Sequence, residues 1–362
     1  MKVAHFIGSM NVGGSENLLM NILRNIDREK YELVFIENVP EKTYYTDEVV
    51  SLGGKIIKTP SFSVANVLRY YIFLKNYFKN NNIDVVHSHT YLHSWIVLAA
   101  AKHANIQKRI AHAHSAMVRY DNGSSVKHAI LRRLLKYYAT RTIACSEAAN
   151  NDLFDGSGDS IIIKNPVDLS RFDFISDEEV DALGKKVGIV KNKTTVIGHI
   201  GRMVDVKNPF FILEIMERLQ SVGADCVLVW LGDGMLRGKI EAYIKEHNLS
   251  NVVKLVGNTN HVAEYIGLFD VFIMPSIYEG LSLAAIEVQS LGVPCVLSST
   301  TSPDTKVNDN VTFLPIDNPS EWASYILSRP EKIDVKDAHE NIVNEGMDVH
   351  SVVEKILRCY ED

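Results

Sequence analysis

The chain alternates short β-branched runs with longer amphipathic stretches along all 362 residues, and this alternation most constrains its fold. Strand-like runs separated by helix-length patterns favour parallel sheets with helices on both faces. Both halves show the pattern, so we predict an α/β protein with two doubly wound domains. The strand-like runs include residues 2–8, 31–37, 83–89, 109–115, 141–146, 194–201, 224–232, 251–257, 271–276 and 294–299.

The length also favours two domains, because 362 residues exceed what one hydrophobic core usually supports. The boundary is predicted in KNPVDLSRFDF, residues 164–174, where Pro166 interrupts regular structure. We therefore predict a first domain over residues 1–168 and a second over residues 169–348. The terminal amphipathic stretch DVHSVVEKILRCYED could pack against either domain.

Charge is distributed unevenly between the two halves. Residues 1–172 carry 21 Lys and Arg against 15 Asp and Glu, whereas the remainder carries 17 against 29, for a total of −6. Halves of opposite charge fit two domains with different partners, although solvated surfaces can also drift in this way without function.

The cysteines and the N-terminus indicate a compartment. The four cysteines are scattered and form no C-x-x-C pair, which suggests reduced thiols rather than a disulfide framework. The start of the chain lacks the apolar run and cleavage-type ending of a signal peptide, and no stretch approaches the roughly 20 apolar residues of a membrane span. We therefore expect a cytoplasmic protein.

Two loops at predicted strand ends carry residues suited to phosphate. In SMNVGGSEN, Gly13 and Gly14 open a helix and allow close approach of a phosphate or sugar hydroxyl, although a tight turn would also use them. Their spacing does not meet the G-x-G-x-x-G dinucleotide pattern. In GRMVDVKN, Arg202 and Lys207 could hold a diphosphate, and the alternative is a solvated basic turn.

Two glutamates interrupt the otherwise apolar run PSIYEGLSLAAIEVQSLGVPCV, residues 275–296. A helix capped by Ser282 would leave Glu279 in the preceding loop and place Glu287 more than one turn along. That spacing argues against the paired carboxylates of a glycosidase. We expect each carboxylate to meet a different part of one extended, hydroxyl-rich ligand.

Histidines cluster in the first half at His87, His89, His93, His112 and His114. Residues i and i+2 of a strand face the same way, so a metal site is conceivable. No acidic partners lie nearby and no D-x-D occurs, so the sequence favours no metal. It favours a role in a binding cleft for at least one histidine, with ordinary polar loop ends as the alternative.

Two stretches, residues 68–82 and 126–141, combine basic and aromatic residues on helical patterns. Such surfaces can hold a protein on anionic lipid, and a core helix with a solvated basic face is the alternative for each. No nucleic-acid motif accompanies them, so we expect no nucleic-acid partner.

The motifs in chain order resemble one family. They are GGSENLLMNI, HAHS, TIACSEAANNDLF, IIIKNPVDLSRF, GRMVDVKNP, LGDGMLR and FIMPSIYEGLSLAAIEVQSLGVPCV. Together they resemble the retaining glycosyltransferases of family 4, also called group 1, and within it the bacterial enzymes of exopolysaccharide and capsular polysaccharide assembly. The resemblance covers nearly the whole chain, and its most specific part is the E-x7-E segment from Glu279 to Glu287.

The resemblance implies a GT-B fold, in which two Rossmann-like domains face a central cleft. The first domain would hold the acceptor and the second the nucleotide-sugar donor. The helix over residues 349–360 would pack back on the first domain. Transfer would retain the anomeric configuration and need neither metal nor cofactor.

By position, the resemblance assigns the donor diphosphate to Arg202 and Lys207. It assigns the donor ribose to Glu287 and sugar hydroxyls to Glu279. The backbone amides of one short segment would help hold the sugar and phosphates; its residues are Gly280, Leu281, Ser282 and Leu283.

From the first domain, the resemblance places His114 beside the reacting sugar, and Gly13 and Gly14 at the cleft. It places the nucleotide base near Gly257 and Asn258. The chain departs from the family at Pro166, where glycine is usual, and at Ser282, where Pro or Phe is frequent; Ser282 could alter how the donor sugar is held.

The expected function is therefore transfer of a hexose or N-acetylhexosamine from a nucleotide diphosphate sugar, most often UDP-linked, to a growing glycan. The acceptor would be a polyprenyl-diphosphate-linked saccharide at the inner membrane surface. Two alternatives remain open: a GT-B sugar-nucleotide epimerase, and a non-catalytic GT-B partner subunit.

Overall fold

The computed structural model describes residues 1–11, 13–114, 125–173, 175–189 and 194–361. The chain forms two compact units, Met1–Pro166 together with Val349–Asp362, and Val167–Asp348. Ser115 and Phe174, which belong to the predicted strand 109–115 and the predicted boundary 164–174, lie outside the described residues, as does Val12 of the glycine loop.

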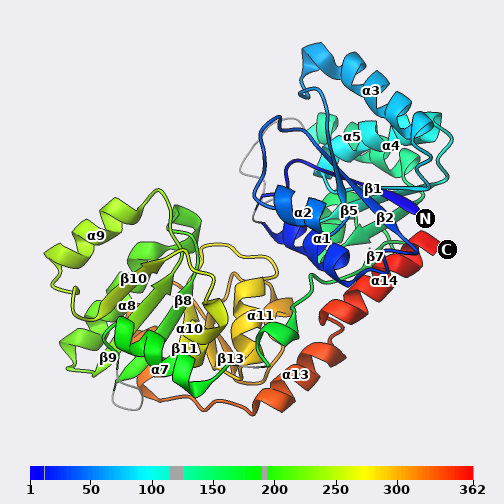
Figure 1. Cartoon of the computed structure of the whole chain (residues 1–362). Helices are drawn as coiled ribbons and strands as arrows, with labels where there is room; N and C mark the ends of the chain where they lie inside the picture. Colours follow the sequence, from blue (N-terminus) through cyan, green and yellow to red (C-terminus); the bar gives the residue numbers. More distant parts are fainter. Residues whose placement is uncertain (12, 115–124, 174, 190–193, 362) are drawn as a thin grey trace. The chain divides into compact units, whose positions relative to one another are not determined.

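The first unit is built on a parallel sheet of seven strands in the order β3-β2-β1-β4-β5-β6-β7 (Figure 1). The order reverses direction between β1 and β4, which is where ligands bind in doubly wound sheets. The strands are β1 (Lys2–Ile7), β2 (Glu32–Glu37), β3 (Lys55–Lys58), β4 (Val85–Ser88), β5 (Lys108–Ala113), β6 (Arg141–Ala144) and β7 (Ile161–Ile162).

Helices cover both faces of this sheet because its central strands carry buried apolar side chains on both sides. One face packs against α1 and α14, and the other against α3, α4, α5 and α6. The helices of the first unit are α1 (Gly14–Asn25), α2 (Thr46–Ser51), α3 (Val67–Asn80), α4 (Ser94–His103), α5 (Ser125–Tyr138), α6 (Glu147–Phe154) and α14 (Val349–Glu361).

The terminal helix α14 belongs to the first unit and packs beside α1 (Figure 1). Its buried face includes Val352, Ile356 and Tyr360, which join the core under β1 and β4. Polar contacts at its end add to this packing: Lys108 Nζ donates to the carbonyl of Glu361 at 2.6 Å, and Lys30 Nζ lies 2.6 Å from the Glu361 carboxylate. The sequence fits this position because its apolar residues recur at helical spacing.

The second unit has a six-stranded sheet whose paired strands are all parallel, in the order β10-β9-β8-β11-β12-β13. Its order reverses between β8 and β11 in the same way as in the first sheet. The strands are β8 (Thr195–Ile200), β9 (Cys226–Leu231), β10 (Val253–Gly257), β11 (Val271–Met274), β12 (Cys295–Ser298) and β13 (Val311–Leu314).

The second sheet is also covered on both faces. One core includes residues of α8, α9 and α12, and the other includes residues of α7, α10, α11 and α13. The helices are α7 (Asp177–Lys186), α8 (Pro209–Ser221), α9 (Arg237–Glu246), α10 (Val262–Leu268), α11 (Leu283–Ser290), α12 (Pro319–Leu327) and α13 (Val335–Asn344).

The predicted α/β class with two doubly wound sheets is confirmed. Each strand-like run named from the sequence contains a strand, whereas β3, β7 and β13 were not among those runs. β7 is only two residues long and β3 lies at a sheet edge with no fully buried residue, so neither gives a strong pattern. The two units meet in the chain at Pro166 and Val167, inside the segment predicted to hold the boundary.

No helix among the described residues is both long enough and apolar enough to cross a membrane.

Candidate active site

The carboxyl ends of the adjacent strands β8 and β11 bring two of the sequence-predicted loops together. Lys207 Nζ, in the loop after β8, donates to Glu279 Oε2, in the loop after β11. Both side chains keep some exposure, 16% and 20%. Ser276 Oγ also donates to Glu279 Oε2, at 3.4 Å, and the amide of Ile277 donates to the Val206 carbonyl at 2.9 Å. The two loops therefore form one polar surface at the point where the strand order reverses.

Local backbone chemistry positions Lys207. A single 3-10 turn, Asp205–Lys207, ends at Asn208, whose φ of 54° lies in the left-handed region that asparagine tolerates well. Pro209 then occupies the first position of α8, where its missing N–H costs no helical hydrogen bond. The turn therefore fixes Lys207 at the start of α8.

Arg202 lies in the same loop and is exposed. Within the described part of the chain, its guanidinium forms no hydrogen bond or ion pair, so its donors remain available to a ligand. The structure thus brings Arg202 and Lys207 into one loop with Glu279 beside it, as a diphosphate and sugar site requires.

Ser282 caps α11 as predicted, and its hydroxyl is engaged within the protein. Its Oγ accepts from the amide of Ala285 at 3.4 Å and donates to Met274 Sδ at 3.3 Å. The Ser282 amide is also used, since it donates to Thr305 Oγ1 at 3.3 Å. Of the four amides proposed to face the ligand, that of Ser282 is therefore already paired inside the protein.

Glu287 lies in the middle of α11, and its side chain is 24% exposed. Burial raises the pKa of its carboxyl, and the guanidinium of Arg171 partly opposes that shift. Arg171 Nη1 lies 3.4 Å from Glu287 Oε1 and is half exposed, so this ion pair only weakly stabilises the folded protein. A partly buried carboxylate with one weak partner is suited to accepting hydrogen bonds from a diol.

The structure places Asn258 two strands away from β8, after β10 at the edge of the sheet, and its side chain is exposed. The preceding residue, Gly257, has a φ of 82°, and its carbonyl accepts from the amide of Gly232 at 2.8 Å. No contact among the described residues joins Asn258 to Lys207 or Glu279.

In the first unit, Gly13 and Gly14 begin α1 beyond the end of β1. Gly13 has a φ of −170°, which other residues also adopt, so its backbone does not require glycine. A Cβ on Gly14 would meet only Asn165 Nδ2, at 3.9 Å. A Cβ on Gly13 would instead lie 2.3 Å from Glu16 Oε2, at the far end of a flexible side chain, so the open space lies beside Gly14 rather than beside Gly13.

Glu37 holds the glycine loop in place, although no sequence motif pointed to this residue. Its carboxylate is fully buried at the end of β2. It accepts from the Met10 amide at 2.5 Å, from Thr43 Oγ1 at 2.9 Å and from Lys58 Nζ at 2.6 Å. These three donors explain why a carboxylate can be buried here.

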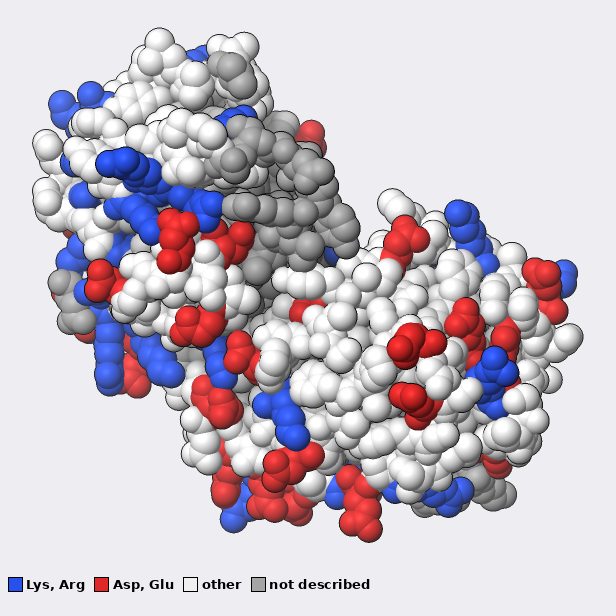
Figure 2. Space-filling model, turned by 180° about the vertical axis from the view of Figure 1, so that it is seen from behind, with Lys and Arg blue, Asp and Glu red and all other residues white. Residues whose placement is uncertain are grey.

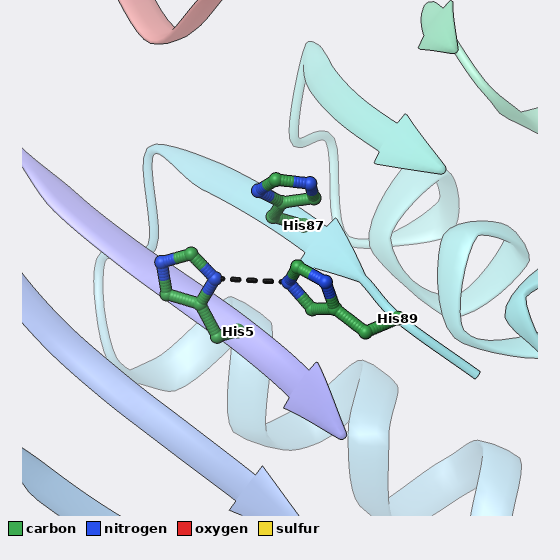
Figure 3. A group of neighbouring side chains, drawn as sticks. All are labelled: His5, His87 and His89. Carbon is green, nitrogen blue, oxygen red and sulfur yellow. Dashed lines mark hydrogen bonds between the residues drawn. The ribbon is translucent and has the colours of Figure 1, made fainter. Parts of the chain in front are cut away.

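Four of the five predicted histidines lie together on the face of the first sheet that α14 covers: His87, His89, His112 and His114. His5, which was not predicted, lies among them. Figure 3 shows His5, on β1, hydrogen-bonded to His89, which follows β4, with His87 of β4 beside them. His89 Nδ1 lies 2.7 Å from His114 Nε2, just beyond β5. The remaining predicted histidine, His93, lies apart from them and packs against Phe62 with the rings tilted by 54°.

The burial of these rings lowers their pKa values. It lowers the pKa of His114 and of His5 to about 3. It also holds the pKa values of His87, His89 and His112 well below the ordinary value, with the neighbouring rings adding to the effect. The five imidazoles are therefore neutral near pH 7.

Ring nitrogens lie within 4.8 Å of one another in two overlapping groups of three histidines. The first group is His5, His87 and His89, and the second is His89, His112 and His114. Neutral imidazoles are good ligands for zinc, copper or nickel.

Comparison with known proteins identifies the family. The model described as Glycosyltransferase Family 4 matches residues 12–171, and the one described as Glycosyl transferases group 1 matches residues 183–331. The glycosyltransferase EpsF of Bacillus subtilis (strain 168) is 31% identical over 376 residues, spanning 99% of this chain and 96% of that protein. The chain belongs to the family 4, or group 1, glycosyltransferases. The predicted family and enzyme class are thus confirmed.

Other relatives of this glycosyltransferase have more specific names. The capsular polysaccharide biosynthesis glycosyltransferase CapH of Staphylococcus aureus is 26% identical, over 95% of this chain and 96% of CapH. An Escherichia coli enzyme named UDP-Gal:alpha-D-GlcNAc-diphosphoundecaprenol alpha-1,3-galactosyltransferase is 25% identical, over 83% of this chain and 79% of its own length.

Solved structures confirm the fold of this glycosyltransferase. The crystal structure of Anabaena HepE in complex with UDP matches with a TM-score of 0.83 at 15% identity, over 99% of both chains. The structure of a glycosyltransferase from Rickettsia africae ESF-5 matches with a TM-score of 0.84 at 16% identity, over 99% of this chain and 97% of that chain. The chain therefore has the GT-B type of fold, with two Rossmann-like sheets.

Sequence reasoning missed several residues that shape the donor-side loops of this glycosyltransferase. A Cβ on Gly232 would lie 2.2 Å from the Gly201 carbonyl oxygen, and one on Gly234 would lie 2.5 Å from that of Met203. The quoted motif LGDGMLR contains both glycines. Only their lack of a side chain lets the loop after β9 press against the loop that carries Arg202.

His199 of β8 is a second missed residue. Its Nδ1–H donates to the Ile273 carbonyl at 2.8 Å, so Nε2 carries the lone pair. Burial lowers its pKa to about 4, and the charge of Lys207 adds to this effect. A Cβ on Gly201 would lie 2.9 Å from His199 Nε2, so this ring supports the loop directly.

Proposed function

We propose that this glycosyltransferase moves a hexose or N-acetylhexosamine from a UDP-sugar to a glycan acceptor, with retention of configuration and without a metal. The observation that carries the donor assignment is the contact of Lys207 with Glu279 beside Arg202, whose guanidinium has no partner among the described residues. Two cations and a carboxylate at the switch point of a sheet suit a diphosphate joined to a sugar. HepE, whose fold is shared, was crystallised with UDP.

The proposed chemistry is a same-face displacement. The bond between the anomeric carbon and the donor phosphate oxygen breaks, and the acceptor oxygen forms the new bond from the same side. The departing phosphate oxygen takes the acceptor proton, so no strong protein base is needed. Arg202 and Lys207 stabilise the charge that develops on that phosphate, and His114 contacts the reacting sugar.

The remaining site residues have proposed roles in binding. Glu279 binds hydroxyls of the donor sugar, and Glu287 binds the ribose diol. The backbone around Gly280, Leu281 and Leu283 approaches the sugar and phosphates, and Asn258 lies toward the base. Gly13 and Gly14 approach the ligand from the first unit.

We propose a lipid-linked acceptor, a saccharide on polyprenyl diphosphate, at the cytoplasmic face of the membrane. The E. coli relative is named for a diphosphoundecaprenol substrate, and CapH for capsular polysaccharide biosynthesis. Figure 2 shows, at upper left, lysine and arginine side chains gathered on the first unit, with acidic side chains among them. On α5, Arg132 and Lys136 both pair with Asp155, whereas Arg133 is exposed.

Thermal shift with UDP-, GDP- and ADP-sugars tests the donor. A ligand at 100 times its Kd stabilises the folded state by about 2.7 kcal/mol, which raises the melting temperature measurably. We expect a shift with a UDP-sugar, and loss of that shift in Lys207→Ala but not in Lys239→Ala, an exposed lysine on α9. A shift only with GDP- or ADP-sugars would contradict the assignment of the base.

Product analysis separates transfer from the two alternatives. A transferase releases UDP slowly without an acceptor and rapidly with one. An epimerase would instead convert the nucleotide sugar with no acceptor present, and a non-catalytic subunit would release no UDP in either case.

A further inference from the structure

Five histidines and one tyrosine form a single hydrogen-bonded chain inside the first unit. Tyr360 OH lies 2.8 Å from His87 Nδ1, and His87 Nε2 lies 3.2 Å from His112 Nδ1. In the other direction Tyr360 OH lies 3.5 Å from His5 Nε2, and His5 Nδ1 lies 3.1 Å from His89 Nε2. His89 Nδ1 then lies 2.7 Å from His114 Nε2. The proposed site residue His114 is thus connected to the C-terminal helix.

Both ends of this histidine chain are buried nitrogens without a partner among the described residues, His114 Nδ1 and His112 Nε2. The chain folds back on itself, so that the rings of His112 and His114 stack with centroids 4.1 Å apart. Two unmet hydrogen-bonding atoms therefore lie on neighbouring rings. An unpaired buried polar atom destabilises the fold, and a ligand or water that hydrogen-bonds to these atoms would remove that cost.

The direction of every hydrogen bond in the chain follows from one contact. A neutral imidazole has one N–H and one lone pair, so each ring donates at one nitrogen and accepts at the other. The three inner histidines, His5, His87 and His89, use both nitrogens. Once the direction at Tyr360 is fixed, the protonated nitrogen of every ring is fixed with it.

Tyr360 sets that direction. Its hydroxyl can donate only once, and its contact with His87 is 0.7 Å shorter than its contact with His5, at 2.8 Å against 3.5 Å. The shorter contact fits a phenol O–H donating to an imidazole lone pair. His5 must then donate its Nε2–H to the phenol oxygen, which leaves the lone pair on its Nδ1. His89 must donate its Nε2–H to that lone pair, and His114 must in turn donate its Nε2–H to His89 Nδ1.

We infer that Tyr360, through this chain, holds His114 as the Nε2–H tautomer, so that its Nδ1 lone pair accepts a hydrogen bond from a hydroxyl of the bound sugar while the Nε2–H of His112 donates beside it. The inference rests on the proposed glycosyltransferase site. Tyr360 is a positioning residue, because it acts on the ligand only through the histidines. A donor next to an acceptor matches a hydroxyl, which offers both functions, whereas a phosphate offers acceptors alone.

Ring-nitrogen NMR of protein with isotope-labelled histidines tests the tautomer without any turnover. Signals of His114 are assigned by their loss in His114→Asn. We expect Nδ1 of His114 to show the shift of an unprotonated nitrogen and Nε2 that of a protonated one. In Tyr360→Phe the chain is cut, and both His114 signals should move toward averaged values. A protonated Nδ1 in the unmodified protein, or unchanged signals in Tyr360→Phe, would overturn the inference.

The matched control is Tyr31→Phe. Tyr31 OH donates to the carboxylate of Glu361, which lies on α14 next to Tyr360. This variant therefore also loses one hydrogen bond between α14 and the rest of the first unit. Within the described part of the chain, Tyr31 makes no hydrogen bond to Tyr360 or the five histidines, and we expect the His114 signals of this variant to match those of the unmodified protein. Equal changes in both variants would mean that helix docking, not the chain, governs His114. A stoichiometric Zn²⁺ or Ni²⁺ that shifts the same signals would identify a metal site and also overturn the inference.

Kinetics test the consequence for transfer. We expect Tyr360→Phe to lower kcat about tenfold with little change in the KM for the UDP-sugar, and Tyr31→Phe to leave both unchanged. In a His114→Asn background, adding Tyr360→Phe should change kcat no further, because its effect passes through His114. Additive losses would mean a general structural role. If the unmodified protein transfers no sugar, the proposed function fails, while the NMR result still decides the tautomer.

Discussion

Lys207 Nζ donates to Glu279 Oε2 across two loops that leave adjacent strands of the second sheet. The two side chains form an ion pair in the absence of ligand. A diphosphate must therefore compete with the Glu279 carboxylate for the Lys207 ammonium. We therefore expect Glu279→Gln to bind free UDP more tightly than the unmodified protein, because Lys207 keeps its full charge for the phosphates. The same variant should lower kcat by about a hundredfold, since it loses the carboxylate proposed to bind the donor sugar. Calorimetry with UDP and initial-rate kinetics measure the two effects.

Removal of the cations should act on the reaction rather than on folding. Arg202→Ala or Lys207→Ala should lower kcat by about a hundredfold or more, because charge on the departing diphosphate loses its compensation. Arg202 is exposed, so its removal should change the melting temperature little, whereas removal of the partly buried Lys207 should lower it only by the loss of the Glu279 contact. The control is Lys239→Ala on α9. Near-normal turnover in either site variant would contradict the proposal that the substituted residue binds the diphosphate.

Glu287→Gln should stabilise the free protein at neutral pH while weakening nucleotide binding. Burial raises the pKa of Glu287 in the folded state above the ordinary value of 4.5, so the folded protein holds this proton more tightly than the unfolded chain. The carboxylate therefore destabilises the fold above the folded-state pKa, and this penalty disappears as the pH falls below 4.5. The amide removes the penalty. Loss of the weak Arg171 contact, at 3.4 Å, offsets only part of the gain.

Thermal melting at neutral pH and again below pH 4.5 measures this effect. The variant should melt higher than the unmodified protein at neutral pH, and the two should converge in acid. Glu340→Gln, at an exposed position on α13, is the control. A higher melting temperature that persists in acid would mean that the carboxylate's charge is not the cause. UDP affinity should fall about tenfold, since a charged hydrogen-bond acceptor is lost.

The fold was accessible from the sequence because periodicity is a local property. Alternating runs and breaks identified most strands of both sheets, though not β3, β7 or β13, and the cap at Ser282 was placed correctly from residue type. The order of the strands within a sheet depends on contacts between distant segments, so no local sequence pattern predicts it. The resemblance nominated Glu279 and Lys207 separately, whereas their contact depends on β8 and β11 being neighbours.

The same limit explains the residues that were missed. His5 is a single histidine in an apolar run, and Tyr360 lies 355 residues away from it in the chain. Only the packing of α14 on β1 and β4 makes them partners. Arg171 and Glu287, 116 residues apart, could not be paired for the same reason.

Gly14→Ala should preserve the fold and impair the reaction. A Cβ there contacts only Asn165 Nδ2 at 3.9 Å, and alanine favours a helix over glycine by up to about 1 kcal/mol. We expect an unchanged or slightly higher melting temperature. The proposed approach of a ligand to this backbone would be obstructed, so kcat/KM should fall at least about tenfold. The control is Gly158→Ala, whose Cβ would meet nothing within 4 Å among the described residues. Full activity in Gly14→Ala would remove the ligand role of this glycine.

Membrane attachment can be tested on α5. Arg133 is exposed, whereas Arg132 and Lys136 are paired with Asp155. Each basic residue near an anionic surface contributes about 1 kcal/mol, so Arg133→Glu should release the protein from anionic vesicles. Lys239→Glu on the second unit should not. Equal sedimentation with anionic and neutral vesicles in the unmodified protein would rule out a charge-driven membrane contact.

Gly232→Ala should destabilise the second unit more than any other substitution considered. The φ of Gly232 is 123°, which disfavours a side chain, and a Cβ would lie 2.2 Å from the Gly201 carbonyl oxygen. Backbone atoms cannot yield as a flexible side chain can, so we expect a loss of about 3 kcal/mol or more in the free energy of unfolding. Gly238→Ala, six residues on in α9, meets nothing within 4 Å and should be neutral or stabilising. Urea unfolding of both variants gives the comparison. Equal midpoints would mean that the loop after β9 can move away from the loop carrying Arg202. The hypothesis that close packing of the two loops supports this arginine would then be wrong.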